Sequence, residues 1–461
     1  MKMLILAALL LSALPVVGFA QQQNRAGKLF PYQYTIDDLP NGLRLVTVPT
    51  DYPNLVALYV VVTAGSRNEV EPGKSGFAHF FEHIMFRGSE NYTPEQREEL
   101  FKRAGAETNA YTSDDRTVYH ATFAKEDLEP IMKAEADRFQ RLKYSEAQFK
   151  TEALAVQGEY DKNSANPFSK MYEVLRETAF KKHTYSHTTM GYLKDIKDMP
   201  NQYQYSLEFY NRFYRPEYAT IVVVGDITRE RALDLTKRYW GEWKRGDYKA
   251  DVPEEPAQRE ARTAHIDWPS PTLPHLAVAF RGPAYSDDKK DKAALDLLAS
   301  IAFGENSELY QQLVLKEQKV DILGPDFSDQ MDPEMFVVLA RVKDPANVNN
   351  VRDRIIETFR KYTTEPVPQS KLDATRSRMR YGFAMAMNSN DAIARSLAPY
   401  ISLRRTPETL NKLFDTYQEI TPEDIRDAAK KYFREDSRTV VTLATKGQNI
   451  ASAKTEKGVN N

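Results

Sequence analysis

The chain has 461 residues, more than a single hydrophobic core usually accommodates, so we expect at least two domains. Its formal net charge of −2 lacks the basic excess that is typical of nucleic-acid-binding proteins, and that class of partner is excluded. The absence of cysteine excludes disulfides and leaves histidine and carboxylate side chains as the ligands of any metal site.

Residues 1–20 are typical of a secretory signal peptide. Lys2 precedes a short apolar run over residues 4–17, and cleavage is predicted after Ala20. The run is short for a membrane span, so we expect a cleaved signal, with an uncleaved anchor as the alternative. No later segment is apolar enough to span a membrane. We therefore expect a periplasmic chain with no membrane span after signal removal, secretion to the medium being the second possibility.

Residues 79–83 read His-Phe-Phe-Glu-His. Positions i and i+4 are neighbours on a helix, so His79 and His83 share a face with Glu82. The flanking residues are apolar, which indicates a largely buried helix where polar groups need partners. This pattern predicts half of a zinc site, with Glu82 able to take a proton from a zinc-bound water. The alternative is a helix whose polar face carries two imidazoles by chance.

A second helix is predicted to begin at Ser145, with Gln148 completing a capping box. It contains Glu152 and Glu159, which are seven residues apart and therefore share a face. One of them could bind the metal while the other orients a histidine ligand. Two solvated glutamates on an exposed helix would give the same pattern, and spacing alone does not choose between these readings.

Two further histidines, His183 and His187, are spaced as metal ligands could be. Threonine, tyrosine and serine surround them, Gly191 follows, and no carboxylate lies close by in sequence. We interpret this segment as a loop in which both histidines are structural.

Segments of the first half of the chain recur in the second half at an offset of 219 residues. Residues 212–224 resemble residues 431–443, each copy reading as a helix end, a turn and a buried strand, and residues 55–62 correspond to 274–281. This indicates an internal duplication. At the same offset His79, Glu82 and His83 correspond to Leu298, Ile301 and Ala302, so the second half lacks the metal residues.

The duplication and the irregular mixture of strands and long helices predict an α+β fold. We expect two homologous α/β-sandwich halves, each a mixed or antiparallel sheet with helices packed on it, facing each other across a cleft. The expected divisions are a signal peptide (1–20), a metal-binding half (21–245), a polar linker (246–273), a metal-free half (274–445) and a flexible tail (446–461).

Four segments together carry a resemblance to a known family. Residues 76–86 around the motif, residues 105–112 and 115–119, and residues 213–226 resemble the pitrilysin/insulinase family of zinc metallopeptidases, the inverzincins. The resemblance covers essentially the whole chain after residue 20. It fits the short, two-domain, processing-peptidase-like members better than the long four-domain ones.

The resemblance implies roles for individual residues. Glu159 stands 76 residues after His83, where the family has its third ligand, and Glu152 stands where a supporting glutamate precedes it. One zinc ion per chain would then be held by His79, His83 and Glu159, with Glu82 as general base. Residues 109–112 resemble the family's edge strand that receives peptide substrates, which implies a substrate-binding role for Asn109, Ala110, Tyr111 and Thr112. An ordinary hairpin strand is the alternative.

The chain departs from the family at one place. Many members contribute an arginine and a tyrosine from the second half, but Val314 and Asp321 stand at those positions here. Valine donates no hydrogen bond, and aspartate would repel a developing oxyanion. We expect a homologous partner subunit to supply the pair, with a homodimer as the other arrangement. Residues elsewhere in the chain, such as Arg380 and Tyr381, are the alternative source.

The leading prediction is therefore a zinc-dependent endopeptidase that acts on peptides or unfolded segments, as the catalytic subunit of a two-chain complex. The alternative is a non-catalytic peptide-binding or scaffold subunit of the same fold. Such a protein would be expected to lose the His/Glu set, and that set is complete here.

Overall fold

A computed structural model describes residues 28–448 of the protein. The predicted signal peptide and most of the predicted tail lie outside these residues. None of the helices between residues 28 and 448 combines the length and the apolarity that crossing a bilayer requires.

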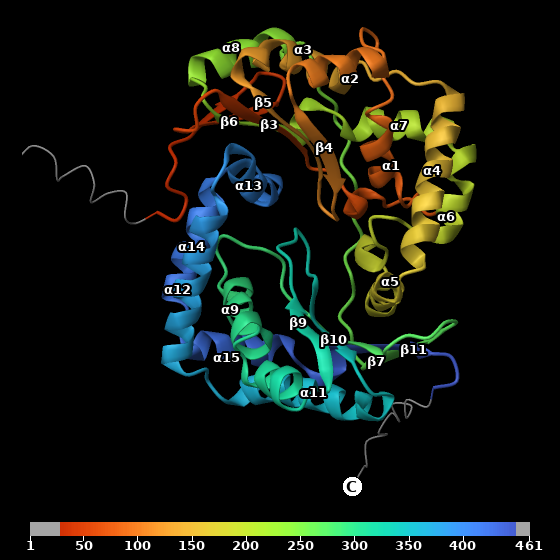
Figure 1. Ribbon diagram of the computed structural model, residues 1–461, viewed down its shortest axis with the longest axis vertical. Helices are drawn as coiled ribbons and strands as arrows, with labels where there is room; N and C mark the ends of the chain where they lie inside the picture. Colours follow the sequence, from red (N-terminus) through yellow and green to blue (C-terminus); the bar gives the residue numbers. More distant parts are fainter. Residues whose placement is uncertain (1–27, 449–461) are drawn as a thin grey trace, which may run out of the picture.

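Two sheets organise the molecule, the first at the top of Figure 1 and the second at the bottom. The first sheet has the strand order β1-β2-β6-β3-β5-β4 and the second β7-β11-β8-β10-β9. The strands of the first sheet are β1 (Thr35–Asp38), β2 (Arg44–Pro49), β3 (Leu55–Val62), β4 (Glu107–Thr112), β5 (Thr117–Ala124) and β6 (Ala219–Gly225). Those of the second are β7 (Arg262–Trp268), β8 (His275–Arg281), β9 (Val320–Asp326), β10 (Met335–Val342) and β11 (Arg438–Thr445).

The two sheets share one topology. β2 pairs with β6 in parallel and β7 pairs with β11 in parallel, while every other strand pair is antiparallel. The second sheet therefore repeats the order β2-β6-β3-β5-β4, and β1 is an addition to the first. The predicted α+β fold of two like halves with mixed sheets is confirmed.

Helices cover the outer face of each sheet. Those of the first half are α1 (Phe77–Ile84), α2 (Pro94–Arg103), α3 (Leu128–Gln140), α4 (Glu146–Ser164), α6 (Leu193–Asp198), α7 (Tyr203–Phe213) and α8 (Arg229–Trp240). The second half contributes α9 (Asp291–Phe303), α10 (Glu308–Tyr310), α11 (Val348–Thr364), α12 (Gln369–Ala386), α14 (Glu408–Glu419) and α15 (Pro422–Tyr432). Of these, α9 and α11 contact strands β8, β9 and β10, whereas α12 and α14 pack on α9.

The inner faces are covered by helices that the two halves exchange. α5 (Pro167–Ala179) follows α4 in sequence but packs on β7, β8 and β11 of the second sheet. α13 (Asn390–Arg404) belongs to the second half but packs on β3 and β6 of the first. Figure 1 shows α13 directly beneath the first sheet. The inner face of each sheet is therefore covered by a helix that belongs to the other half.

This exchange explains why the central strands are apolar without alternation. In β3, Val60 faces the outer helices, whereas Tyr59 and Val61 face α13. A strand that is buried on both faces reads as a continuous hydrophobic run. The buried inner face of the first sheet thus forms one apolar cluster with α13 and the core of the second half.

The structure differs from the predicted linker over residues 246–273. β7 lies within it and pairs with β11 from Arg262 to Trp268. β7 is an edge strand on which exposed residues alternate with partly buried ones. Its composition is therefore polar, like that of a linker, and the second half begins earlier than residue 274.

Two hairpin turns also join the halves. In the turn between β4 and β5, Asp115 accepts a hydrogen bond from the Met331 backbone N–H at 2.7 Å, and Asp114 accepts one from Gln330 Nε2 at 3.1 Å. Both donors lie between β9 and β10. Nearby, Arg67 Nε lies 2.5 Å from Asp332 Oδ2. This contact holds the Asp115 carboxyl group away from water, and its burial raises the pKa of Asp115 to about 6.

The helix exchange makes a testable prediction. Leu397 of α13 is fully buried against the first sheet. Leu397→Ala should lower the free energy of unfolding by about 2–5 kcal/mol, because it leaves a cavity. Hydrogen exchange followed by mass spectrometry should quicken at β3 and β6, far away in sequence. Leu315→Ala, at a leucine that is 54% exposed, is the matched control. Unchanged exchange at β3 and β6 in the Leu397 variant would contradict the proposed dependence.

Candidate metal centre

The helix α1 carries the His-x-x-Glu-His motif in a buried setting. It begins after Gly76, whose φ of +91° is left-handed, and a Cβ there would lie 2.5 Å from Ile196 Cδ1, so only glycine fits. Phe77, Phe80 and Phe81 anchor the helix in the core of the first half. The helix is thereby fixed at its start and along its apolar face, and the polar residues lie on the remaining face.

The predicted third ligand joins that face. Glu159 of α4 places its Oε2 atom 3.6 Å from His79 Nε2 and 3.4 Å from His83 Nε2. All three ligand atoms lie within 4.8 Å of one another, and residues 28–448 contain no other comparable group of histidine and acidic residues. The structure therefore brings together three residues that come from two helices.

The spacing of these atoms fits a zinc ion. Zinc bonds to nitrogen and oxygen are about 2.0–2.1 Å long, and a tetrahedral arrangement separates the ligand atoms by about 3.3–3.4 Å. The two nitrogen–oxygen distances are close to that value. Two imidazoles and a carboxylate are also a donor set that zinc accepts, with a fourth position left for water.

Glu152 lies behind His83. Its Oε2 atom is 3.7 Å from His83 Nδ1, and its other oxygen pairs with Arg87. The neighbouring Glu152 carboxylate raises the pKa of His83. Burial tends to raise the pKa of Glu152, but His83 and Arg87 together lower it below its usual range. Glu152 thus places a negative charge beside the nitrogen of His83 that faces away from Glu159, as expected for a residue that orients a ligand.

His79 has a different environment. Burial and the neighbouring His83 lower its pKa to about 4, so its imidazole is neutral at pH 7, the form that binds metals. Its Nδ1 atom is buried and has no hydrogen-bond partner among the described residues. The orientation of this ring is therefore set by its packing and by the helix backbone.

Glu82 lies between the histidines and β4. Its Oε2 atom accepts a hydrogen bond from Thr112 Oγ1 at 2.8 Å. Burial raises the pKa of Glu82, and the bond from Thr112 opposes that rise. A raised pKa brings a carboxylate closer to the range in which a general base works at neutral pH. Sequence reasoning placed Thr112 only in a substrate strand, and its contact with Glu82 was not predicted.

The strand β4 lies at the edge of the first sheet, as predicted for residues 109–112. It pairs with β5 on one side only. Asn109 is exposed, Ala110 is buried, and Tyr111 and Thr112 are partly buried. An edge strand leaves backbone N–H and C=O groups unpaired, and these can bind an extended chain.

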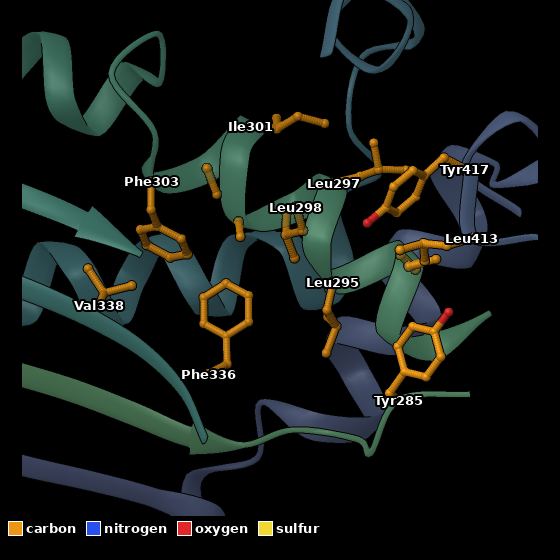
Figure 2. Packing of buried hydrophobic residues seen from close by; sticks show 14 of the residues in the cluster. Tyr285, Leu295, Leu297, Leu298, Ile301, Phe303, Phe336, Val338, Leu413 and Tyr417 are labelled. Carbon is orange, nitrogen blue, oxygen red and sulfur yellow. The ribbon is translucent and has the colours of Figure 1, made fainter. Parts of the chain in front are cut away.

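The second half carries no copy of this site. At the duplicated positions, Leu298, Ile301 and Ala302 lie on α9 in the apolar core. Figure 2 shows Leu298 in the cluster that also contains Phe303 and Phe336, whose ring centroids are 5.9 Å apart. The same helix position thus carries candidate metal ligands in one half and apolar packing residues in the other.

The residues at the expected arginine and tyrosine positions have other contacts. Val314 is partly buried against the second-half core, and Asp321 on β9 pairs with Arg341 at 2.8 Å. The alternative residues, Arg380 and Tyr381, lie on α12, at the left of Figure 1, whereas α1 and α4 lie at the right.

The other histidine pair does not form a metal site. His183 Nε2 lies 2.9 Å from Asp332 Oδ2, and its Nδ1 atom accepts the Tyr185 backbone N–H. His187 Nδ1 lies 2.9 Å from the carbonyl oxygen of Thr188. The two histidines flank a short 3₁₀ turn and have separate partners, which agrees with their predicted structural role.

Sequence reasoning missed Arg87 as a partner of Glu152. It stands four residues after His83, and this spacing was the one available signal, because such residues are neighbours when a helix continues. The contact depends on α1 and α4 meeting at this end, which the sequence does not encode locally.

The fold and the ligand set define a two-half metallopeptidase-like protein, and family models identify the class. A model described as insulinase (peptidase family M16) matches residues 44–192. A second, described as peptidase M16 inactive domain, matches residues 202–379. The chain belongs to the pitrilysin/insulinase family.

Individual relatives extend across both halves. The zinc protease PqqE of Helicobacter pylori is 28% identical over 415 residues, covering 88% of this chain and 91% of the relative. The mitochondrial-processing peptidase subunit beta of Caenorhabditis elegans is 23% identical over 421 residues, covering 88% and 89%. The crystal structure of a protease from Helicobacter pylori matches with a TM-score of 0.83 and 27% identity, over 90% of this chain and 99% of that one.

The contact of Glu152 with His83 yields a prediction. Glu152→Gln should raise the zinc dissociation constant about 10–100-fold, as the loss of a residue that supports a ligand typically does. Competition with a chromophoric chelator measures the constant. Glu146→Gln is the control, because Glu146 lies on the same helix in an exposed pair with Lys150. Equal dissociation constants for wild type and Glu152→Gln would contradict the supporting role.

Proposed function

We propose that the protein is a zinc-dependent endopeptidase that hydrolyses peptides or unfolded polypeptide segments. The observation that carries this proposal is the convergence of His79, His83 and Glu159 beside Glu82, next to the edge strand β4. Membership of the pitrilysin/insulinase family and the relative named as a zinc protease support it.

His79, His83 and Glu159 are the residues that would hold one zinc ion per chain. A zinc ion bound there would lower the pKa of a water molecule and polarise the scissile carbonyl. Glu82 then accepts a proton on its carboxylate and returns it to the leaving amine. Thr112 holds the Glu82 side chain in place through Oε2, so the base is directed toward the end of β4.

We propose that the substrate adds to β4 as a further strand. Backbone hydrogen bonding to Asn109, Ala110, Tyr111 and Thr112 would recognise an extended chain largely independently of its sequence. Thr112 is the last residue of β4, and its side chain donates a hydrogen bond to Glu82. A peptide that is aligned on β4 would therefore also be aligned with the base.

The transition-state donors that the second half lacks point to a partner. We propose that a homologous subunit supplies an arginine and a tyrosine, and that this chain is the catalytic subunit of a two-chain complex. The positions occupied by Val314 and Asp321 support this arrangement, as does a relative that is named as a subunit. A homodimer is the second arrangement, and a non-catalytic peptide-binding or scaffold role is the second function.

The proposed location is the periplasm. It depends on the signal-like composition of residues 1–20, which predicts export. Fractionation of the cells that produce the protein, with mass determination of its N-terminus, tests both the location and cleavage after Ala20.

The role of Glu82 is tested by Glu82→Gln, which keeps the shape of the side chain and removes the base. We expect full zinc content by elemental analysis and a loss of about 10²–10⁴-fold in kcat/KM on a quenched peptide. Glu98→Gln, at an exposed glutamate on α2, should behave like wild type. Cleavage by Glu82→Gln at the wild-type rate would refute the assignment.

The partner proposal is tested by assaying the purified, zinc-loaded chain alone. We expect little peptide hydrolysis until a homologous chain that carries the arginine and tyrosine is added, because the transition-state donors are then supplied. Light scattering reports the assembly, and chelator sensitivity identifies metal-dependent cleavage. Strong activity from a monomer or homodimer would exclude the need for a second subunit. A zinc-loaded chain that stays inactive in the complex would favour the scaffold role.

A further inference from the structure

Glu69 is a fully buried carboxylate at the start of the metal-binding helix. Its Oε2 atom accepts the backbone N–H of Gly76, and its Oε1 atom accepts the backbone N–H of Ala78, both at 2.7 Å. Both donors belong to the first turn of α1, although Glu69 lies outside that helix. Each oxygen of one side chain therefore holds one backbone group of the turn that carries His79.

A helix needs such a partner at its start. The first backbone N–H groups of a helix have no acceptor within it, and they are usually satisfied by the side chain of the N-cap residue. The N-cap of α1 is Gly76, which has no side chain to offer. Glu69 takes that place from seven residues upstream.

The position of His79 makes this capping relevant to the metal site. His79 directly follows Ala78, and its Nδ1 atom has no hydrogen-bond partner within residues 28–448. His83, by contrast, has Glu152 beside its Nδ1 atom. The ring of His83 thus has a polar neighbour that can orient it, whereas the orientation of His79 depends on where its backbone is placed.

We propose that Glu69 is a positioning residue for the metal centre, which fixes the first turn of α1 and thereby the direction of the His79 ring. This proposal rests on the proposed function, because it assumes that His79 binds zinc. Glu69 would support His79 by holding the backbone of its helix turn, whereas Glu152 would support His83 by lying beside its ring.

Replacing Glu69 by glutamine removes one hydrogen-bond acceptor whether or not Glu69 is protonated. Burial raises its pKa to about 8, and the two N–H donors oppose that rise. Glu69→Gln replaces one oxygen by an NH₂ group in either case, and an NH₂ group cannot accept a backbone N–H. The variant keeps the volume of the side chain and removes one of the two hydrogen bonds.

The experiment compares wild type, Glu69→Gln and Glu71→Gln in the full chain. Glu71 is two residues away and pairs with Arg212 at 3.0 Å near the surface, so it is the matched control. The readouts are the zinc dissociation constant by chelator competition and the visible absorption spectrum of the cobalt-substituted protein, which reports ligand geometry. We expect Glu69→Gln to bind zinc about 10–100-fold more weakly and to change the cobalt spectrum. Glu71→Gln should match wild type in both.

The zinc dissociation constant and the cobalt spectrum distinguish a failure of the positioning role of Glu69 from a failure of zinc binding itself. A Glu69→Gln variant that melts earlier but keeps the wild-type zinc constant and cobalt spectrum would overturn the proposal, since Glu69 would then be a cap for stability alone. A wild-type chain that binds no zinc would overturn the proposed function and this proposal with it.

A second variant keeps the proposal testable if Glu69→Gln does not fold. Glu69→Asp retains the carboxyl group, but its shorter side chain cannot reach both N–H groups in the same way. We expect weaker zinc binding and an altered cobalt spectrum from the folded Asp variant. Wild-type values for both would overturn the proposal.

Discussion

The site depends on one geometric constraint: two imidazole nitrogens and one carboxylate oxygen must lie within 4.8 Å of one another although they come from two separate helices. α1 and α4 are far apart in sequence, so their crossing has to be fixed by packing that does not involve the metal. Phe80 of α1 and Phe149 of α4 supply part of it, with ring centroids 5.0 Å apart in the core of the first half. The apolar face of α1 thereby determines where its polar face can bind.

The two halves share a sheet topology but differ in this respect. Among the described residues, only the first half brings two histidines and a glutamate together. In the second half the equivalent helix, α9, buries Leu298 and Ile301 in an apolar core, which stabilises packing without requiring polar partners. The exchange of α5 and α13 then ties the folding of both halves together, because neither sheet is covered on its inner face by its own half.

The sequence predicted the parts whose signals are local or periodic. The His-x-x-Glu-His spacing, the strand-like runs and the duplication predicted α1, the buried strands and two like halves. It did not predict β7, because an edge strand with exposed alternate residues has the composition of a linker. It also did not predict which sheet α5 and α13 cover, since amphipathic helices do not encode their partners. Glu159 was chosen over an exposed-glutamate reading only through the family resemblance.

One short segment, residues 65–69, takes part both in a contact between the halves and in capping the start of α1. Within it, the backbone N–H of Arg67 bonds to the Asp114 carbonyl at 2.8 Å, its carbonyl accepts Thr184 Oγ1 at 2.7 Å, and its guanidinium pairs with Asp332 of the second half. Glu69 follows two residues later and holds the first turn of the metal-binding helix. The Arg67–Asp332 pair and the carboxyl group that caps α1 therefore lie two residues apart in one segment. The second half contacts this segment, although it contributes none of the three candidate metal ligands.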